Sequence, residues 1–177
     1  MGHTLAEKIL IYNTKVKTCK PGDIVITKPD MVMFHDIYTP FVYDKFKEMG
    51  FSKVWDVGKI AIMLDHLLPT CLKDDPRHLR YGYQFAEEFG IVNFHAADGI
   101  SHQLMPELRY AKPGGVVYVT DSHTTTYGAV GCFSTGIGYT EMASILGTGE
   151  LWARVPSAVK IQIDGELPTG IYAKDII

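Results

Sequence analysis

Four short apolar runs, each followed closely by polar and imidazole side chains, constrain the fold of this 177-residue chain most strongly. The clearest run is 115–119, which leads into Asp121, Ser122 and His123. A short apolar run rich in β-branched residues predicts a buried strand. Because ligands bind at the carboxyl ends of strands in open α/β sheets, the Asp-Ser-His segment is expected to form part of a site.

The other three runs have similar polar residues after them. His35-Asp36 follows residues 31–34, and Asp65-His66 follows residues 60–64. Ser101-His102-Gln103 is expected in a loop that follows the strand candidate at 91–95. A carboxylate hydrogen-bonded to one imidazole nitrogen fixes the tautomer and raises the basicity of the other nitrogen. The clusters therefore predict a site that transfers protons near neutral pH. The sequence leaves the pairing open, since Asp65 could orient His66, His102 or His123.

Each cluster also has a purely structural interpretation. A single histidine at a strand end is more often a hydrogen-bonded structural residue than a catalytic one. An aspartate after a strand often caps the next helix, and Ser122 and Thr124 are suited to the same task. Four such clusters in one chain favour a shared site over four separate structural roles.

Helical patterns alternate with the predicted strands. Helices are expected from a capping box at Thr4 and Glu7, from Thr39-Pro40 to Gly50, from Asp75-Pro76 to Phe89, and over 139–146. Further short strands are expected at 23–27 and 159–163, the latter ending in an Asp-Gly hairpin signal, and the start of another helix is expected at 173–177. Alternation of strands and helices predicts an α/β fold with a parallel or mixed sheet flanked by helices.

The interior and the glycines carry further expectations. Met31, Met33 and Met63 are expected in the core, and Trp55 and Trp152 are expected to anchor packing. The glycine-rich segment 128–138 includes a partial dinucleotide fingerprint with glutamate at its last position, and no P-loop lysine follows it. Close backbone packing around the Asp-Ser-His turn is the favoured interpretation of these glycines.

Composition excludes several classes of protein. The formal charge is −3, and no basic block indicates nucleic acid or a membrane surface as a partner. No apolar stretch approaches the roughly 18 residues of a membrane span. The cysteines Cys19, Cys71 and Cys132 are far apart and form no Cys-x-x-Cys pair, which argues against a disulfide framework and favours a cytoplasmic location.

At the polar clusters the sequence resembles the aconitase superfamily. Three motifs carry the resemblance: Met33-Phe34-His35-Asp36 with Thr39-Pro40, Leu64-Asp65-His66 with Pro69, and Asp121-Ser122-His123-Thr124 through Gly138. The segments 149–152, 155–156 and 170–175 extend it over essentially the whole chain. Histidine at position 35, where aconitases proper have glutamine, favours the branch of isopropylmalate and homoaconitate dehydratase large subunits.

The resemblance implies an iron–sulfur hydro-lyase that moves a hydroxyl between adjacent carbons of 2-isopropylmalate or a related hydroxy acid. A [4Fe–4S] cluster with one iron not bound by cysteine would act on the leaving hydroxyl. The implied catalytic residues are Asp65, His66, His102, Asp121 and His123. The implied substrate-binding residues are His35, Ser122 and Thr124.

The family's cluster cysteines lie downstream of the matched region, and we carry that role onto none of the three cysteines here. Residues 1–177 are therefore expected to be the N-terminal α/β part of a large subunit, without the cluster-binding and mobile domains. Alone it is expected to be inactive and to bind no cluster, and a small subunit carrying the mobile domain is the expected partner.

Two other classes of function compete with the dehydratase. One is a binding or regulatory module that reuses the fold without chemistry. The other is a metal-dependent hydrolase built on His35, His66, His102 and His123, which lack the helix spacing of common zinc motifs.

Overall fold

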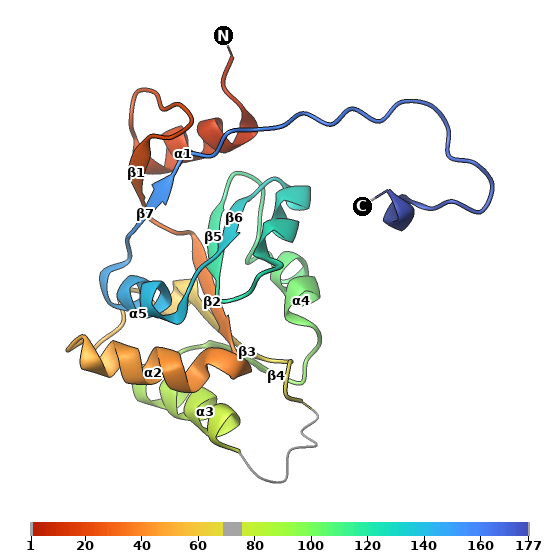
Figure 1. The fold of residues 1–177 in the computed structure, drawn as a ribbon. Helices are drawn as coiled ribbons and strands as arrows, with labels where there is room; N and C mark the ends of the chain where they lie inside the picture. The colour runs from red at the N-terminus through yellow and green to blue at the C-terminus, as the bar shows by residue number, and fades with distance from the viewer. Residues whose placement is uncertain (1, 69–75, 177) are drawn as a thin grey trace.

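The computed structural model describes residues 2–68 and 76–176 (Figure 1). The helices are α1 Leu5–Thr14, α2 Thr39–Glu48, α3 Arg77–Phe89, α4 Ser101–Glu107 and α5 Tyr139–Thr148. The short 3-10 helices are η1 Asp36–Tyr38, η2 Val57–Lys59, η3 Thr124–Val130 and η4 Ala173–Asp175. The strands are β1 Ile24–Thr27, β2 Met31–His35, β3 Ile60–Leu64, β4 Asn93–Ala96, β5 Val116–Val119, β6 Phe133–Gly136 and β7 Leu151–Arg154.

Five strands form a parallel sheet in the order β4-β3-β2-β5-β6. The remaining two, β1 and β7, pair antiparallel in a separate ribbon. The predicted α/β class is confirmed, and the main sheet is parallel throughout. Within this sheet, β2 is the first strand along the chain, and later strands add to one side as β3 and β4 and to the other as β5 and β6. The switch point therefore lies between β2 and β5, where α/β sheets open a crevice for ligands.

Alternating strand residues pack against helices on the two faces of the sheet. Phe34 and Ile62 lie in the cluster that contains side chains of α2, α3 and α5, including Phe46 and Phe85. The residues between them on the strands face the other way, as Met33 does, against α4 and η3. Figure 1 shows the pair α2 and α3 side by side and α4 apart from them. Both faces are covered, which explains why the strands read as continuous apolar runs.

Local sequence signals fix most helix ends. Both halves of the Thr4 capping box form, with the Glu7 N–H donating to the Thr4 hydroxyl at 3.2 Å and the Thr4 N–H donating to the Glu7 carboxylate at 3.0 Å. Gly90 and Gly149 end α3 and α5 in the left-handed conformation, at φ 68° and 73°. The methionines at 31, 33 and 63 are buried as predicted.

The predicted strand at 159–163 is wrong. No strand forms there within the described residues, and Val159 and Ile161 are 86% and 81% exposed. An alternating pattern does not form a strand without a neighbouring strand to bond with. Trp152 was expected to anchor packing, but it is 57% exposed on β7, whereas Trp55 packs against the core.

Smaller corrections concern boundaries. The strand expected at 91–95 is β4, which begins two residues later, and the segment 101–103 opens helix α4 instead of lying in a loop. The helix expected to run to Gly50 ends at Glu48, and Met49 follows it and is exposed. Pro69, Cys71 and the predicted helix start at Asp75 lie outside the described residues. None of the helices in the described ranges has the length and hydropathy that a bilayer-spanning helix requires.

Candidate active site

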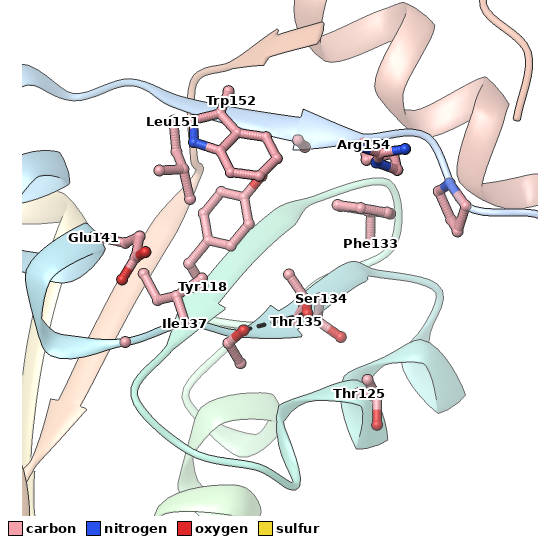
Figure 2. Close-up of a pocket in the computed structure, with 14 residues that line it drawn as sticks. Tyr118, Thr125, Phe133, Ser134, Thr135, Ile137, Glu141, Leu151, Trp152 and Arg154 are labelled. Atoms are coloured by element: carbon pink, nitrogen blue, oxygen red, sulfur yellow. Dashed lines mark hydrogen bonds between the residues drawn. The ribbon is translucent and has the colours of Figure 1, made fainter. Parts of the chain in front are cut away.

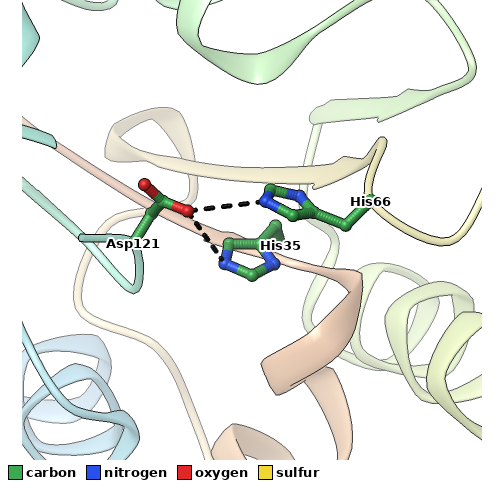
Figure 3. Close-up of side chains that lie close together, drawn as sticks. All are labelled: His35, His66 and Asp121. Atoms are coloured by element: carbon green, nitrogen blue, oxygen red, sulfur yellow. Dashed lines mark ion pairs between the residues drawn. The ribbon is translucent and has the colours of Figure 1, made fainter. Parts of the chain in front are cut away.

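The Asp121 carboxylate is the centre of the site, two residues beyond the end of β5. Its Oδ1 accepts a hydrogen bond from His102 Nε2 at 2.9 Å and one from the backbone N–H of His123 at 2.6 Å. Its Oδ2 lies 3.4 Å from His66 Nε2 and 3.7 Å from His35 Nε2 (Figure 3). The structure thus gathers the imidazoles of all four polar clusters around one carboxylate, at the switch point between β2 and β5.

Asp121 is held in its ionised form. Burial acts to raise the pKa of Asp121, but hydrogen bonds from the His123 backbone and the His102 ring, with the charges of His102 and His35, hold it below its usual range. An ionised carboxylate only accepts hydrogen bonds. His102 Nε2 must therefore carry a proton and donate it to Asp121.

Asp65 and His66 form the hydrogen-bonded pair that the sequence left open. His66 Nδ1 lies 2.8 Å from Asp65 Oδ1, and the other carboxylate oxygen of Asp65 accepts the backbone N–H of Ser101 at 2.7 Å. Asp65 thereby joins the end of β3 to the start of α4. Because Nδ1 donates to the carboxylate, the lone pair of neutral His66 is on Nε2, which points toward Asp121. The His66 side chain is 30% exposed, so part of the ring is accessible to a small molecule.

Asp36 holds the backbone of His66 in place, although the sequence alone assigned no role to Asp36. Its buried carboxylate accepts the backbone N–H groups of His66 at 3.3 Å and Leu67 at 2.7 Å. Burial acts to raise the pKa of Asp36, but the imidazole of His35, 3.7 Å away, and these two N–H groups hold it below its usual range. Its position directly after a buried strand was the available signal.

His35 forms the floor of the site. It is the last residue of β2 and is only 1% exposed. Its Nε2 donates to the carbonyl of Thr120 at 2.9 Å, while its Nδ1 has no hydrogen-bond partner among the described residues. The ring stacks on that of His66, with centroids 4.0 Å apart and planes 17° from parallel. His35 therefore fixes the plane of the His66 ring.

The residues after Asp121 divide between the rim and the interior. The His123 side chain is 80% exposed, with Nδ1 3.3 Å from Asp121 Oδ1 and 3.5 Å from the Ser122 hydroxyl. Thr124 is buried, and its hydroxyl donates to the Asp121 carbonyl at 2.6 Å. The side chains of Ser122 and His123 are exposed, whereas Thr124 holds the turn closed from inside.

A glycine lets β6 approach this turn. A Cβ added to Gly136 would collide with the backbone carbonyl of Asp121. The prediction that the glycine-rich segment packs backbone around the Asp-Ser-His turn is confirmed at this position. The cavity here has a volume of about 360 Å³, and Asp121, Ser122 and Gly136 contribute to its wall.

A second cavity of about 530 Å³ adjoins the first along β6 and extends toward β7 (Figure 2). Its wall is mostly apolar, with Glu141 and Arg154 well separated on opposite sides and Tyr118 and Trp152 between them. No histidine of the described residues lines it. No described histidine lines the smaller cavity either, but Asp121, on which the histidines converge, does, so we place the candidate site there.

Three sets of donor atoms within 4.8 Å of one another were considered as metal sites: His35-His66-Asp121, His102-Asp121-His123 and Asp36-Asp65-His66. The stacked rings of His35 and His66 cannot aim both lone pairs at one ion, and His102 Nε2 already donates to Asp121. The carboxylates of Asp36 and Asp65 already accept backbone N–H groups. We assign no metal ligand among them.

The cysteines of the described chain do not fit an iron–sulfur cluster. Cys19 and Cys132 are buried in two different side-chain clusters, and their thiols donate to the carbonyls of Glu7 and Lys112. Burial raises the pKa of both thiols, which disfavours the thiolate that ligates iron. Neither cysteine lies at the cavity beside Asp121.

Comparison with known proteins agrees with the geometry. The sequence matches the aconitase family (aconitate hydratase) over residues 7–177. The chain belongs to the aconitase family. It is 43% identical over 178 residues to the 3-isopropylmalate dehydratase large subunit 1 of Methanopyrus kandleri, covering 100% of this chain and 42% of that protein.

Other relatives give the same result. The 3-isopropylmalate dehydratase large subunit of Acetivibrio thermocellus is 43% identical, with 100% of this chain and 43% of the relative covered. The large subunit 1 of Thermotoga maritima is 41% identical, with 100% and 42% covered. The chain therefore spans less than half the length of these curated relatives. The resemblance drawn from the motifs around His35, His66 and Asp121 is confirmed at the level of the family.

Proposed function

We propose that this chain supplies one wall of the active site of an aconitase-type hydro-lyase that dehydrates and rehydrates 2-isopropylmalate. Homoaconitate and other alkylmalates are the alternatives within the same chemistry. The observation that carries the proposal is the convergence of four imidazoles on the ionised carboxylate of Asp121. Removal of water from a hydroxy acid needs one group to take a proton from carbon and another to protonate the leaving hydroxyl, and this wall holds acid–base groups suited to such transfers.

Within that wall the residues divide the work. His66, oriented by Asp65, is the group that exchanges a proton with substrate or solvent through Nε2. Asp121 supplies a fixed negative charge that stabilises a protonated imidazole beside it. His123 and Ser122 contact the substrate. His35 acts on the substrate only indirectly, by stacking on the ring of His66. Thr124 supports the turn.

The family generally uses a [4Fe–4S] cluster, which acts as a Lewis acid on the hydroxyl. The described cysteines do not form its ligand set, so we propose that its cysteines come from a part of the polypeptide outside residues 1–177. The chain alone is then inactive. Anaerobic reconstitution of the 177-residue chain with iron and sulfide should give no stoichiometric cluster absorbance, and stable incorporation would overturn this point.

We further propose a partner and a location. Relatives named large subunits imply a small subunit, and we assign to it the mobile domain that closes the site. The free thiols of Cys19 and Cys132 fit a reducing compartment, which agrees with a cytoplasmic location.

Substrate turnover by the assembled enzyme tests the proposal. The full-length protein carrying this chain, combined with its small subunit and a reconstituted cluster, should convert 2-isopropylmalate faster than homocitrate or citrate at equal concentration. Preference for homocitrate would place the protein in the homoaconitase branch. No turnover of any hydroxy acid, with the cluster intact, would favour the regulatory module instead. Family membership already disfavours the hydrolase, which would require stoichiometric zinc.

A further inference from the structure

Tyr127 contacts the site from inside the protein, although the sequence gave no reason to include it. It lies on η3 and is 1% exposed. Its hydroxyl oxygen is 2.8 Å from His102 Nδ1, and the two rings have centroids 5.6 Å apart. The opposite ring nitrogen, Nε2, is bonded to Asp121 at 2.9 Å. Both nitrogens of His102 are therefore engaged.

The proton positions in this array follow from the partners. Asp121 is ionised and can only accept, so Nε2 of His102 carries a proton. Burial, and then the negative charges of Asp121 and Asp65, raise the pKa of Tyr127, which keeps its phenol protonated. Among the described residues the only hydrogen-bond partner of that phenol is His102 Nδ1. Tyr127 therefore donates, and Nδ1 must present a lone pair.

A second tyrosine–histidine pair in the chain shows that this arrangement is not automatic. Tyr110 lies 3.0 Å from His95 Nε2, and Asp98 lies 2.9 Å from His95 Nδ1. The Tyr110 hydroxyl, however, donates to Asn93 Oδ1 at 3.2 Å, so its oxygen accepts from His95. His95 can thus donate from both nitrogens, whereas a second proton on His102 would leave the buried Tyr127 hydroxyl without an acceptor.

We propose that Tyr127 is a positioning residue that holds His102 as the neutral Nε2–H tautomer. His102 then acts as a constant hydrogen-bond donor to Asp121, and it does not itself exchange protons with substrate. The charged or titratable groups that face His102 are Asp121, Tyr127 and the ring of His123, whose centroid is 5.9 Å away. Of His66 and His102, two of the residues implied as catalytic, His102 has both ring nitrogens hydrogen-bonded, whereas Nε2 of His66 has no hydrogen bond to the described residues. This division of roles in catalysis rests on the proposed function, but the tautomer does not.

Ring-nitrogen NMR of the ¹⁵N-labelled 177-residue chain tests the tautomer without any turnover. At neutral pH, His102 should show a protonated Nε2 and an unprotonated, hydrogen-bonded Nδ1. Tyr127→Phe should move the Nδ1 resonance toward that of a free imidazole nitrogen and leave His95 unchanged. The matched control, Tyr110→Phe, should change His95 and leave His102 unchanged.

Two results would overturn the assignment: a doubly protonated or Nδ1-protonated His102 in the wild-type chain, or a His102 spectrum that Tyr127→Phe does not alter. The wild-type spectrum decides alone if the variant fails to fold. In the assembled enzyme, Tyr127→Phe should lower kcat about fivefold with little change in KM, the effect of one hydrogen bond. An altered spectrum with unchanged kcat would refute the catalytic part, and absence of turnover in the wild type would refute only the proposed function.

Discussion

Gly136→Ala should destabilise the protein because it forces two backbones apart. The added Cβ would overlap the backbone carbonyl oxygen of Asp121, which cannot move aside as the end of a flexible side chain could. Gly136 pairs with Val119 in the sheet, and the next residue, Ile137, donates its N–H to the Val119 carbonyl at 2.9 Å. β6 therefore cannot slide away without breaking its hydrogen bonds to β5. Overpacking of this kind costs about 1–3 kcal/mol.

Denaturant unfolding of the variant and a matched control measures this cost. Gly128→Ala is the control, because a Cβ there meets nothing within 4 Å and the residue lies in the same glycine-rich segment. The control should lie within about 0.5 kcal/mol of wild type. Equal free energies of unfolding for Gly136→Ala and Gly128→Ala would refute the close-approach reasoning. A destabilised Gly136→Ala should also lose site geometry, since the displaced turn carries Asp121.

Two further predictions concern buried polar groups. Thr27→Val should lower the free energy of unfolding by about 1–3 kcal/mol, because the Thr27 hydroxyl is hydrogen-bonded to the Tyr118 phenol at 2.7 Å and to the Leu151 carbonyl at 2.8 Å. Thr27→Ser, which keeps the hydroxyl, should restore most of the lost stability. A valine variant as stable as wild type would contradict a stabilising role for this hydroxyl. Asp36→Asn should destabilise the protein at neutral pH, measured by urea unfolding across pH. Because the pKa of Asp36 is lowered on folding, its stabilisation is complete above the unfolded value of about 3.9 and is lost as pH falls through the folded value, so the difference from wild type should shrink in acid. A difference that grows in acid would show that the sign is wrong.

The sheet and its carboxyl edge were predictable because burial and periodicity act locally. A strand covered on both faces reads as a continuous apolar run, so 31–34, 60–64 and 116–119 were found as strands. The polar residues after them had to share an edge, since parallel strands point the same way. The segment 159–163 shows the limit of the same reasoning, because its alternation needs a neighbouring strand that the described chain does not provide.

The pairing within the site was not predictable. Asp65 pairs with His66, its neighbour, whereas His102 crosses from α4 to Asp121, and only the packing of loops decides between them. The sequence places Asp36 directly after a predicted strand, but its hydrogen bonds to backbone N–H groups depend on the path of a later loop. Tyr127 looked like an ordinary core aromatic, and its hydroxyl gains a role only because η3 places it beside His102.

The most direct test of the central claim is the rate of 2-isopropylmalate dehydration by the assembled, cluster-loaded enzyme carrying Asp121→Asn. The asparagine keeps the size of the side chain but removes the charge on which the histidines converge. Turnover should fall by about 10² or more, as should that of His66→Ala, while His95→Ala, outside the site, should leave it unchanged. Near-normal turnover by Asp121→Asn, with cluster content and folding intact, would contradict the assignment of this wall as the catalytic one.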